Sequence, residues 1–316
     1  MGNCIPVSPS VLESENSLDL QDIMGNLSYD YSNITILEYD AAPCHNQYCA
    51  FFQHVAPTFL ALTCAAATLG SGALLVALAR LPHAWGWPQS RALVSQLAVA
   101  MSLFAALLPP VAMGIARGWR LGTGLCRLTH LLWHWSLFAQ GLLVASGSCS
   151  TIWCRWDPRS RRLAVAVWAA ALLLATPAAL AGGTAAAPEM SCIRRSVPIV
   201  SPAYLLHLAL CLCLFLLLPA VLLVAVLALP RLRAGSKPGI GVSWLFFVLW
   251  VPYGVGLAVD FLLHTQLLQP TCSTFEHFDY MLGLSEGLGL LHCCLGPAAL
   301  LTAQLCRRRA GPSSSS

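Results

Sequence analysis

The sequence has 316 residues, of which 57% are hydrophobic and only 9% are charged. Soluble domains carry about 25% charged residues, so the composition excludes an ordinary soluble protein and indicates a chain that crosses a membrane several times. The formal net charge of +4 is unevenly distributed, because residues 1–79 lack Lys and Arg but hold seven of the thirteen acidic residues.

Residues 1–54 are predicted to form an acidic, disordered extracellular arm. Asn26-Leu27-Ser28 and Asn33-Ile34-Thr35 are acceptors for N-glycosylation, which is useful only on a lumenal or extracellular segment. The arm is polar and has no hydrophobic period, which is typical of disorder. No short apolar segment precedes residue 55, so we expect no cleaved signal peptide.

Tyrosines lie beside acidic residues in this arm. Sulfation of one or more of them would add fixed negative charge, and the alternative is that they are plain tyrosines in a loose segment. The residues are Tyr29, Tyr31 and Tyr39, beside Asp30, Glu38 and Asp40.

Seven apolar stretches follow, each near the ~20 residues that a helix needs to cross a bilayer. We predict an all-α membrane protein, with a seven-helix bundle over residues 55–305 and a short tail over 306–316. The predicted spans are Val55–Ala79, Ala92–Ile115, Gly124–Ile152, Leu163–Gly182, Ala203–Leu229, Ile240–His264 and His277–Leu305.

The basic residues between the spans predict the orientation. Twelve Lys and Arg residues fall on one side and five on the other, and the richer side is expected to be cytoplasmic. The N-terminus is then extracellular and the C-terminus cytoplasmic. The glycosylation acceptors agree with this orientation independently.

The fourteen cysteines divide by compartment. An oxidising exterior favours disulfides among the outer group, which is Cys4, Cys44, Cys49, Cys126, Cys192 and Cys272. A Cys126–Cys192 pair would fix the loop after span four over the mouth of the bundle. Cys272 would tie the arm through Cys44 or Cys49. We see no zinc-type cysteine spacing, nucleotide loop or catalytic constellation, so no metal, no cofactor and no enzyme activity are predicted.

The last span holds one carboxylate, Glu286, followed by His292-Cys293-Cys294 and Gly296-Pro297. A carboxylate within a membrane span costs roughly 2.5–3.5 kcal/mol on insertion scales, so Glu286 should face a watery cavity. It either contacts a ligand or makes a structural hydrogen bond. His292 is expected to be a satisfied core residue rather than a ligand or a titrating switch.

Several landmarks together resemble a rhodopsin-like G-protein-coupled receptor, and within that superfamily a chemokine receptor. His292-Cys293-Cys294-Leu295 with Glu286 upstream is close to the seventh-span pattern of chemokine receptors. The other matching positions are Gly70, Leu97-Ala98-Val99-Ala100, Pro109, Trp168, Pro219, Trp250-Val251-Pro252-Tyr253 and Pro297.

Four departures lie on the route that couples such a receptor to a G protein. The Asp-Arg-Tyr of a signalling receptor is Ser150-Thr151-Ile152 here, and Asn-Pro-x-x-Tyr becomes Gly296-Pro297-Ala298-Ala299-Leu300. The second-span Asp is replaced by Met101 and the first-span Asn by Ser71. Four losses on one route argue against ordinary coupling.

This combination resembles the atypical chemokine receptors of the Duffy antigen type. The matching segments are Met1-Gly2-Asn3-Cys4, Ala41-Ala42-Pro43-Cys44, Gln96-Leu97-Ala98-Val99, Phe138-Ala139-Gln140 and Asp260-Phe261-Leu262. The resemblance favours Cys44 over Cys49 as the partner of Cys272. It implies a receptor that binds chemokines of more than one class, internalises or transcytoses them, and does not activate G proteins. A conventional G-protein-coupled peptide or chemokine receptor is the alternative.

The resemblance and the charge distribution predict the partners and the ligand-binding residues. Chemokines are mostly basic, and an acidic arm would attract them. Lipid and receptor homo- or hetero-oligomers are further candidate partners, and nucleic acid is not. We expect a plasma-membrane protein that cycles to early and recycling endosomes. Predicted ligand-binding residues are Asp22, Tyr29, Asp30, Tyr31, Glu38, Tyr39, Asp40, Asp260, Asp279 and Glu286. For Asp260, a solvated surface acid is the alternative.

Overall fold

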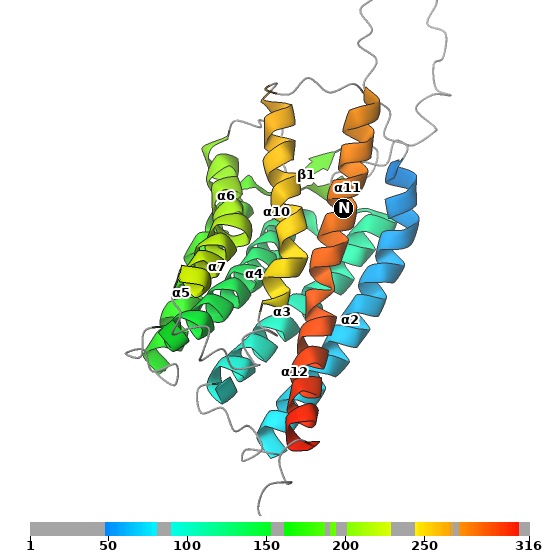
Figure 1. The fold of residues 1–316 in the computed structure, drawn as a ribbon. Coiled ribbons are helices and arrows are strands. Elements are labelled where there is room, and N and C mark those ends of the chain that lie inside the picture. Colours follow the sequence, from blue (N-terminus) through cyan, green and yellow to red (C-terminus); the bar gives the residue numbers. More distant parts are fainter. Residues whose placement is uncertain are drawn as a thin grey trace, which may run out of the picture.

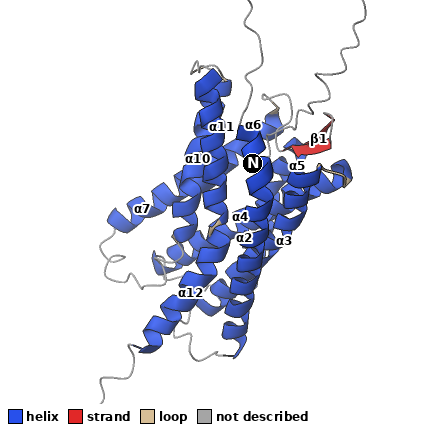
Figure 2. Ribbon diagram, turned by 90° about the vertical axis from the view of Figure 1, so that its right-hand side faces the viewer, coloured by secondary structure: helices blue, strands red, loops and turns tan. Residues whose placement is uncertain are grey.

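The fold of the protein is given by a computed structural model, which describes residues 48–80, 90–152, 161–186, 190–193, 201–228, 244–265, 267 and 272–309. Long helices stand side by side as a bundle, and a two-stranded hairpin lies at one end of it (Figures 1 and 2). We call this end the hairpin end. The helices are α2 (Tyr48–Arg80), α3 (Ser90–Arg117), α4 (Gly122–Ile152), α5 (Arg161–Ala181), α6 (Pro202–Leu212), α7 (Leu218–Ala228), α10 (Leu245–His264), α11 (Cys272–Leu290) and α12 (His292–Arg309).

The structure confirms an all-α membrane-type chain. Within the described residues, six segments are long and apolar enough to cross a membrane, and the first and last of them are Phe51–Arg80 and His277–Ala303. The third predicted span, which is α4, is not among the six. Its 31 residues would extend about 46 Å, more than the ~30 Å of a hydrocarbon core, so length is not what separates it from the others.

The polar side chains of α4 explain its lower hydropathy. Ser136 and Gln140 are completely buried, and His130 and His134 are each 6% exposed. The helix packs between α3 and α5 and also contacts α7 and α10, so protein rather than lipid surrounds these groups. A central helix in such a bundle needs fewer apolar side chains than a helix that faces lipid.

Two predicted spans are interrupted in the structure. The fifth consists of α6, one π-helical turn η3 (Cys213–Leu217) and α7. The seventh was predicted as one helix over 277–305, but it is divided at Leu291 into α11 and α12 and begins earlier, at Cys272. Backbone hydrogen bonds continue on both sides of the break. The Leu291 N–H donates to the Leu288 carbonyl at 3.2 Å, and the Leu295 N–H donates to the Leu291 carbonyl at 2.9 Å.

Small residues and hydrogen bonds join neighbouring helices. A Cβ placed on Gly70 would lie 3.3 Å from the Pro297 Cβ, so this glycine allows α2 to approach α12 closely. The Trp168 indole N–H donates to Oε1 of Gln96 at 2.7 Å and links α5 to α3.

The centre of the core contains a chain of hydrogen bonds from α10 to α4. The Trp250 indole N–H donates to Nδ1 of His292 at 3.0 Å. Nε2 of that ring lies 2.6 Å from Oε1 of Gln140, and Nδ1 also lies 2.6 Å from the Gly289 carbonyl oxygen. Phe215 stacks on Trp250, with ring centroids 5.1 Å apart. His292 is 1% exposed, so it is the satisfied core residue that the sequence predicts.

Residue 289 must be a glycine, because the Trp250 ring packs directly against its backbone. A Cβ on Gly289 would lie 2.8 Å from Cδ2 and Cε3 of this rigid, buried ring. Gly289→Ala should therefore destabilise the protein by about 1–3 kcal/mol through overpacking. The thermal unfolding midpoint of the purified protein in detergent measures the effect.

Gly72→Ala is the matched control, because Gly72 is also inside a helix but a Cβ there meets nothing within 4 Å. Replacing this helical glycine by alanine should leave the thermal unfolding midpoint of the protein unchanged or raise it. An equal or higher midpoint for Gly289→Ala than for the parent chain would contradict the packing described here.

Candidate functional site

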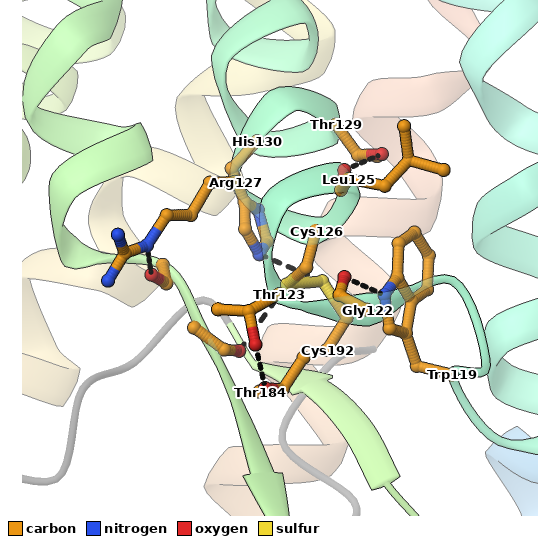
Figure 3. The surroundings of a disulfide bond; sticks show 12 residues. Trp119, Gly122, Thr123, Leu125, Cys126, Arg127, Thr129, His130, Thr184 and Cys192 are labelled. Atoms are coloured by element: carbon orange, nitrogen blue, oxygen red, sulfur yellow. Dashed lines mark hydrogen bonds between the residues drawn. A yellow bond between two sulfur atoms is a disulfide. The ribbon is translucent and has the colours of Figure 1, made fainter.

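A disulfide and two hydrogen bonds fix the hairpin to the start of α4 (Figure 3). Strand β1 (Gly183–Ala186) pairs antiparallel with β2 (Met190–Ile193), and Thr184 is the register partner of Cys192. Cys192 is bonded to Cys126, the same pair that the sequence analysis expects. The Thr184 and Thr123 hydroxyl oxygens lie 2.7 Å apart, and Nε of Arg127 donates to the Gly182 carbonyl at 3.4 Å.

The turn between α3 and α4 is also fixed at this end. Gly118 and Gly122 have φ angles of 73° and 77°, a region that favours glycine. The Trp119 indole N–H donates to the Gly122 carbonyl at 2.9 Å, and the side chain is only 3% exposed. The turn therefore holds Cys126 at a defined position, one helical turn further along α4.

Aromatic packing joins α2 to α11 near the hairpin end. Tyr280 lies 5.6 Å from both Phe51 and Phe52, measured between ring centroids. A Cβ on Gly283 would lie 2.5 Å from the Phe52 ring, so a glycine is needed where the two helices meet. This contact places the beginning of α2 against the helix that carries two of the predicted ligand-binding acids.

The predicted acidic residues of the bundle lie at different depths. Asp260 is four residues from the end of α10 and is only 4% exposed. Asp279 and Glu286 are seven residues apart on α11, which puts them on one face and about 10 Å apart along the axis. Asp279 is half-buried, whereas Glu286 is 3% exposed.

Glu286 thus lies within the bundle rather than at its rim. Counting 14 residues from the start of α11 places it about 20 Å from the hairpin end. It precedes His292 by six residues and is therefore separated from the buried chain of hydrogen bonds by less than two turns.

The other predicted site residues lie outside the described part of the chain. The proposed sulfation and glycosylation sites lie within residues 1–47 of the arm, whereas residues 48–54 form the start of α2. The Cys44–Cys272 bridge also stays a prediction, although Cys272 is the first residue of α11. The undescribed residues are Asp22, Asn26, Tyr29, Asp30, Tyr31, Asn33, Glu38, Tyr39, Asp40 and Cys44.

Sequence reasoning missed a cluster of imidazoles and a thiol between α4 and α6. His134, His207 and Cys211 bring possible metal-ligand atoms within 4.8 Å of one another. The available signal was the four-residue spacing between His207 and Cys211, which places both on one face of a helix. A similar group of Cys126, His130 and Cys192 offers no thiolate, because its two sulfurs form the disulfide.

Comparison with known proteins gives relatives that match along almost the whole chain. No protein-family model matches. The chain is 33% identical to Atypical chemokine receptor 1 of Homo sapiens over 338 residues, covering 98% of this chain and 92% of that protein. The Gorilla gorilla gorilla protein of the same name is 33% identical, covering 95% and 90% of the two chains.

The Bos taurus relative of that name is 32% identical, covering 97% of this chain and 92% of its own length. The matched region includes the helices that carry Asp260, Glu286 and the disulfide. Because 32–33% identity extends over 95–98% of the sequence, this chain belongs to the atypical chemokine receptor 1 family.

Proposed function

We propose that this protein binds basic chemokines of more than one class at the hairpin end of the bundle and removes them by internalisation or transcytosis, without activating a G protein. The observation that carries the proposal is the match along 98% of the chain to a protein named Atypical chemokine receptor 1. The charge distribution and the packing of the core support the same function independently.

The proposed topology has seven membrane-spanning helices, with α4 at the centre, and the hairpin end outside the cell. The disulfide supports this orientation, because such bonds persist in an oxidising exterior. The excess of Lys and Arg in the loops at the other end supports it as well. The acidic arm, which enters α2 directly, then lies beside the proposed binding surface.

Ligand capture is proposed to occur in two steps. The arm contains no Lys or Arg and would attract a cationic chemokine, raising its association rate in a salt-dependent manner. A segment that orders on binding loses some of its interaction free energy but accommodates several partners. The basic N-terminus of the chemokine would then enter the bundle toward Asp279 and Glu286.

The proposed absence of G-protein coupling rests on two buried positions, Met101 and Ser71, where the receptor resemblance expects a different, polar side chain. Met101 stands where the receptor resemblance expects an aspartate, and it is 4% exposed within an apolar cluster. Its Cε lies 2.8 Å from where a Gly296 Cβ would be. Ser71, at the position of the expected asparagine, is completely buried, and its hydroxyl has no hydrogen-bond partner in the described part of the chain.

Neutralising the arm tests the capture step. Asp22→Asn, Asp30→Asn, Glu38→Gln and Asp40→Asn together should lower the affinity for a basic chemokine about tenfold at low salt, and less at high salt, because screening already weakens the attraction. Binding of a labelled chemokine to membranes over a salt series measures both effects. Asp157→Asn, which removes an acid predicted to be cytoplasmic, should change neither. Unchanged affinity and salt dependence in the fourfold variant would contradict the steering role.

Glu286→Gln tests the second step, because it removes the charge and keeps the shape and hydrogen-bonding capacity of the side chain. If Glu286 contacts the ligand, chemokine affinity should fall about tenfold, as expected for a lost charge-assisted hydrogen bond, with an unchanged thermal unfolding midpoint. Parent-like affinity for Glu286→Gln combined with a lower midpoint for Glu286→Ala would assign Glu286 the structural role instead.

Nucleotide exchange distinguishes this function from that of a conventional signalling receptor. In reconstituted membranes with a heterotrimeric G protein, a bound chemokine should leave guanine-nucleotide exchange at its basal rate. A signalling chemokine receptor in the same membranes provides the positive control. Stimulated exchange would favour the alternative function.

A further inference from the structure

Three side chains with metal-ligand atoms converge between α4 and α6, near the hairpin end. His134 is eight residues beyond Cys126, about 12 Å along α4. His207 and Cys211 lie on the facing helix, and the ligand atoms of all three residues are within 4.8 Å of one another. In a tetrahedral zinc site with bonds of about 2.0–2.3 Å, neighbouring ligand atoms are roughly 3.3–3.6 Å apart. Small side-chain shifts would therefore complete such a site.

The two ligands on α6 already have the required separation. Sγ of Cys211 lies 3.6 Å from Nε2 and 3.8 Å from Nδ1 of His207. Their spacing of four residues keeps both on one helix face without any change of the backbone. The His134 ring meets the His207 ring edge-on, with centroids 4.4 Å apart, so the third ligand comes from a different helix.

A backbone carbonyl orients the third ligand. Nδ1 of His134 lies 2.9 Å from the His130 carbonyl oxygen, and since a carbonyl can only accept, Nδ1 carries the proton. Nε2 then keeps its lone pair. Histidines that bind metals commonly donate their other ring N–H to such a group, which fixes the tautomer and the ring orientation.

Burial and ligand type together indicate which ion fits. His134 is 6% exposed and Cys211 3%, while His207 is half-buried. The site is therefore largely buried but accessible to an ion through His207. Two imidazoles and a thiolate are nitrogen and sulfur ligands, which suit Zn²⁺ and not Mg²⁺ or Ca²⁺.

We propose that His134, His207 and Cys211 form a Zn²⁺ site that links α4 to α6. Nε2 of His134, one ring nitrogen of His207 and the Cys211 thiolate would supply three ligands, and a water molecule the fourth. The thiol releases its proton to solvent when the Zn–S bond forms. The bound ion would connect two helices that have few direct contacts, because both α4 and α6 pack against α5, which lies between them. The site does not depend on the proposed chemokine binding.

Thermal unfolding of the full-length protein tests the site. The protein is purified in detergent through an affinity tag without histidines, treated with a chelator and titrated with Zn²⁺. Binding to the folded state should raise the unfolding midpoint by several degrees, and Mg²⁺ should not. Cys211→Ser and His207→Asn should each weaken the apparent Zn²⁺ affinity at least tenfold. His134→Gln provides a third variant in case one of these fails to fold.

Cys213→Ser and His54→Gln are the matched controls, because Cys213 is an exposed thiol two residues from Cys211 and His54 an exposed imidazole on α2. Both should keep the Zn²⁺ response of the parent chain. Co²⁺ should give the visible absorption of a tetrahedral thiolate complex in the parent and in Cys213→Ser, and not in Cys211→Ser. The proposal is overturned if Zn²⁺ leaves the midpoint unchanged, or if the cluster variants respond like the parent.

Discussion

The chain of hydrogen bonds through His292 determines how the centre of the bundle is assembled. Polar groups inside a membrane protein cannot obtain hydrogen bonds from lipid, so a buried polar group is stabilised by a partner within the protein. The Trp250 indole at 3.0 Å and the Gln140 amide at 2.6 Å are such partners, and they come from α10 and α4. A shift of either helix by one residue would leave a buried polar group without its hydrogen bond, at a cost of about 1–3 kcal/mol.

Glycines around this chain allow its aromatic side chains to pack closely. Gly289 leaves room for the Trp250 ring, and Gly254 leaves room for Phe215, whose Cβ would be 2.8 Å from an added methyl group. The stacked pair Phe215–Trp250 joins the π-helical turn η3 to α10. Gly289 therefore supports both the polar chain and the aromatic stack, because Trp250 belongs to both, while Gly254 supports the stack.

Hydropathy predicted the helices well, because lipid-facing residues have to be apolar whatever their detailed packing. It failed to mark α4 as strongly as the other spans, because a helix surrounded by protein is free to carry Gln140 and His134. The break at Leu291 also had no clear signal, since Gly and Pro are common throughout these helices. The Cys126–Cys192 pair was predictable because both residues lie on the side expected to be extracellular. The His134–His207–Cys211 cluster was not, because it depends on how α4 and α6 are rotated relative to each other, and no local sequence pattern gives that rotation.

The two ends of the bundle differ in a way that bears on the proposed lack of signalling. At the hairpin end, a disulfide and side-chain hydrogen bonds fix the loops to α4. Deeper in the bundle, a small cavity is lined by His292 and otherwise by Gly296 and apolar side chains such as Met101, Val144 and Phe246. A ligand transmits a signal only by favouring one of two arrangements, and buried polar networks with alternative partners are a common way to provide them. Neither Met101 nor Gly296 carries a hydrogen-bonding side chain, whereas the receptor resemblance expects an aspartate and an asparagine at these positions. The proposed lack of signalling therefore rests on the loss of these two polar side chains beside the cavity.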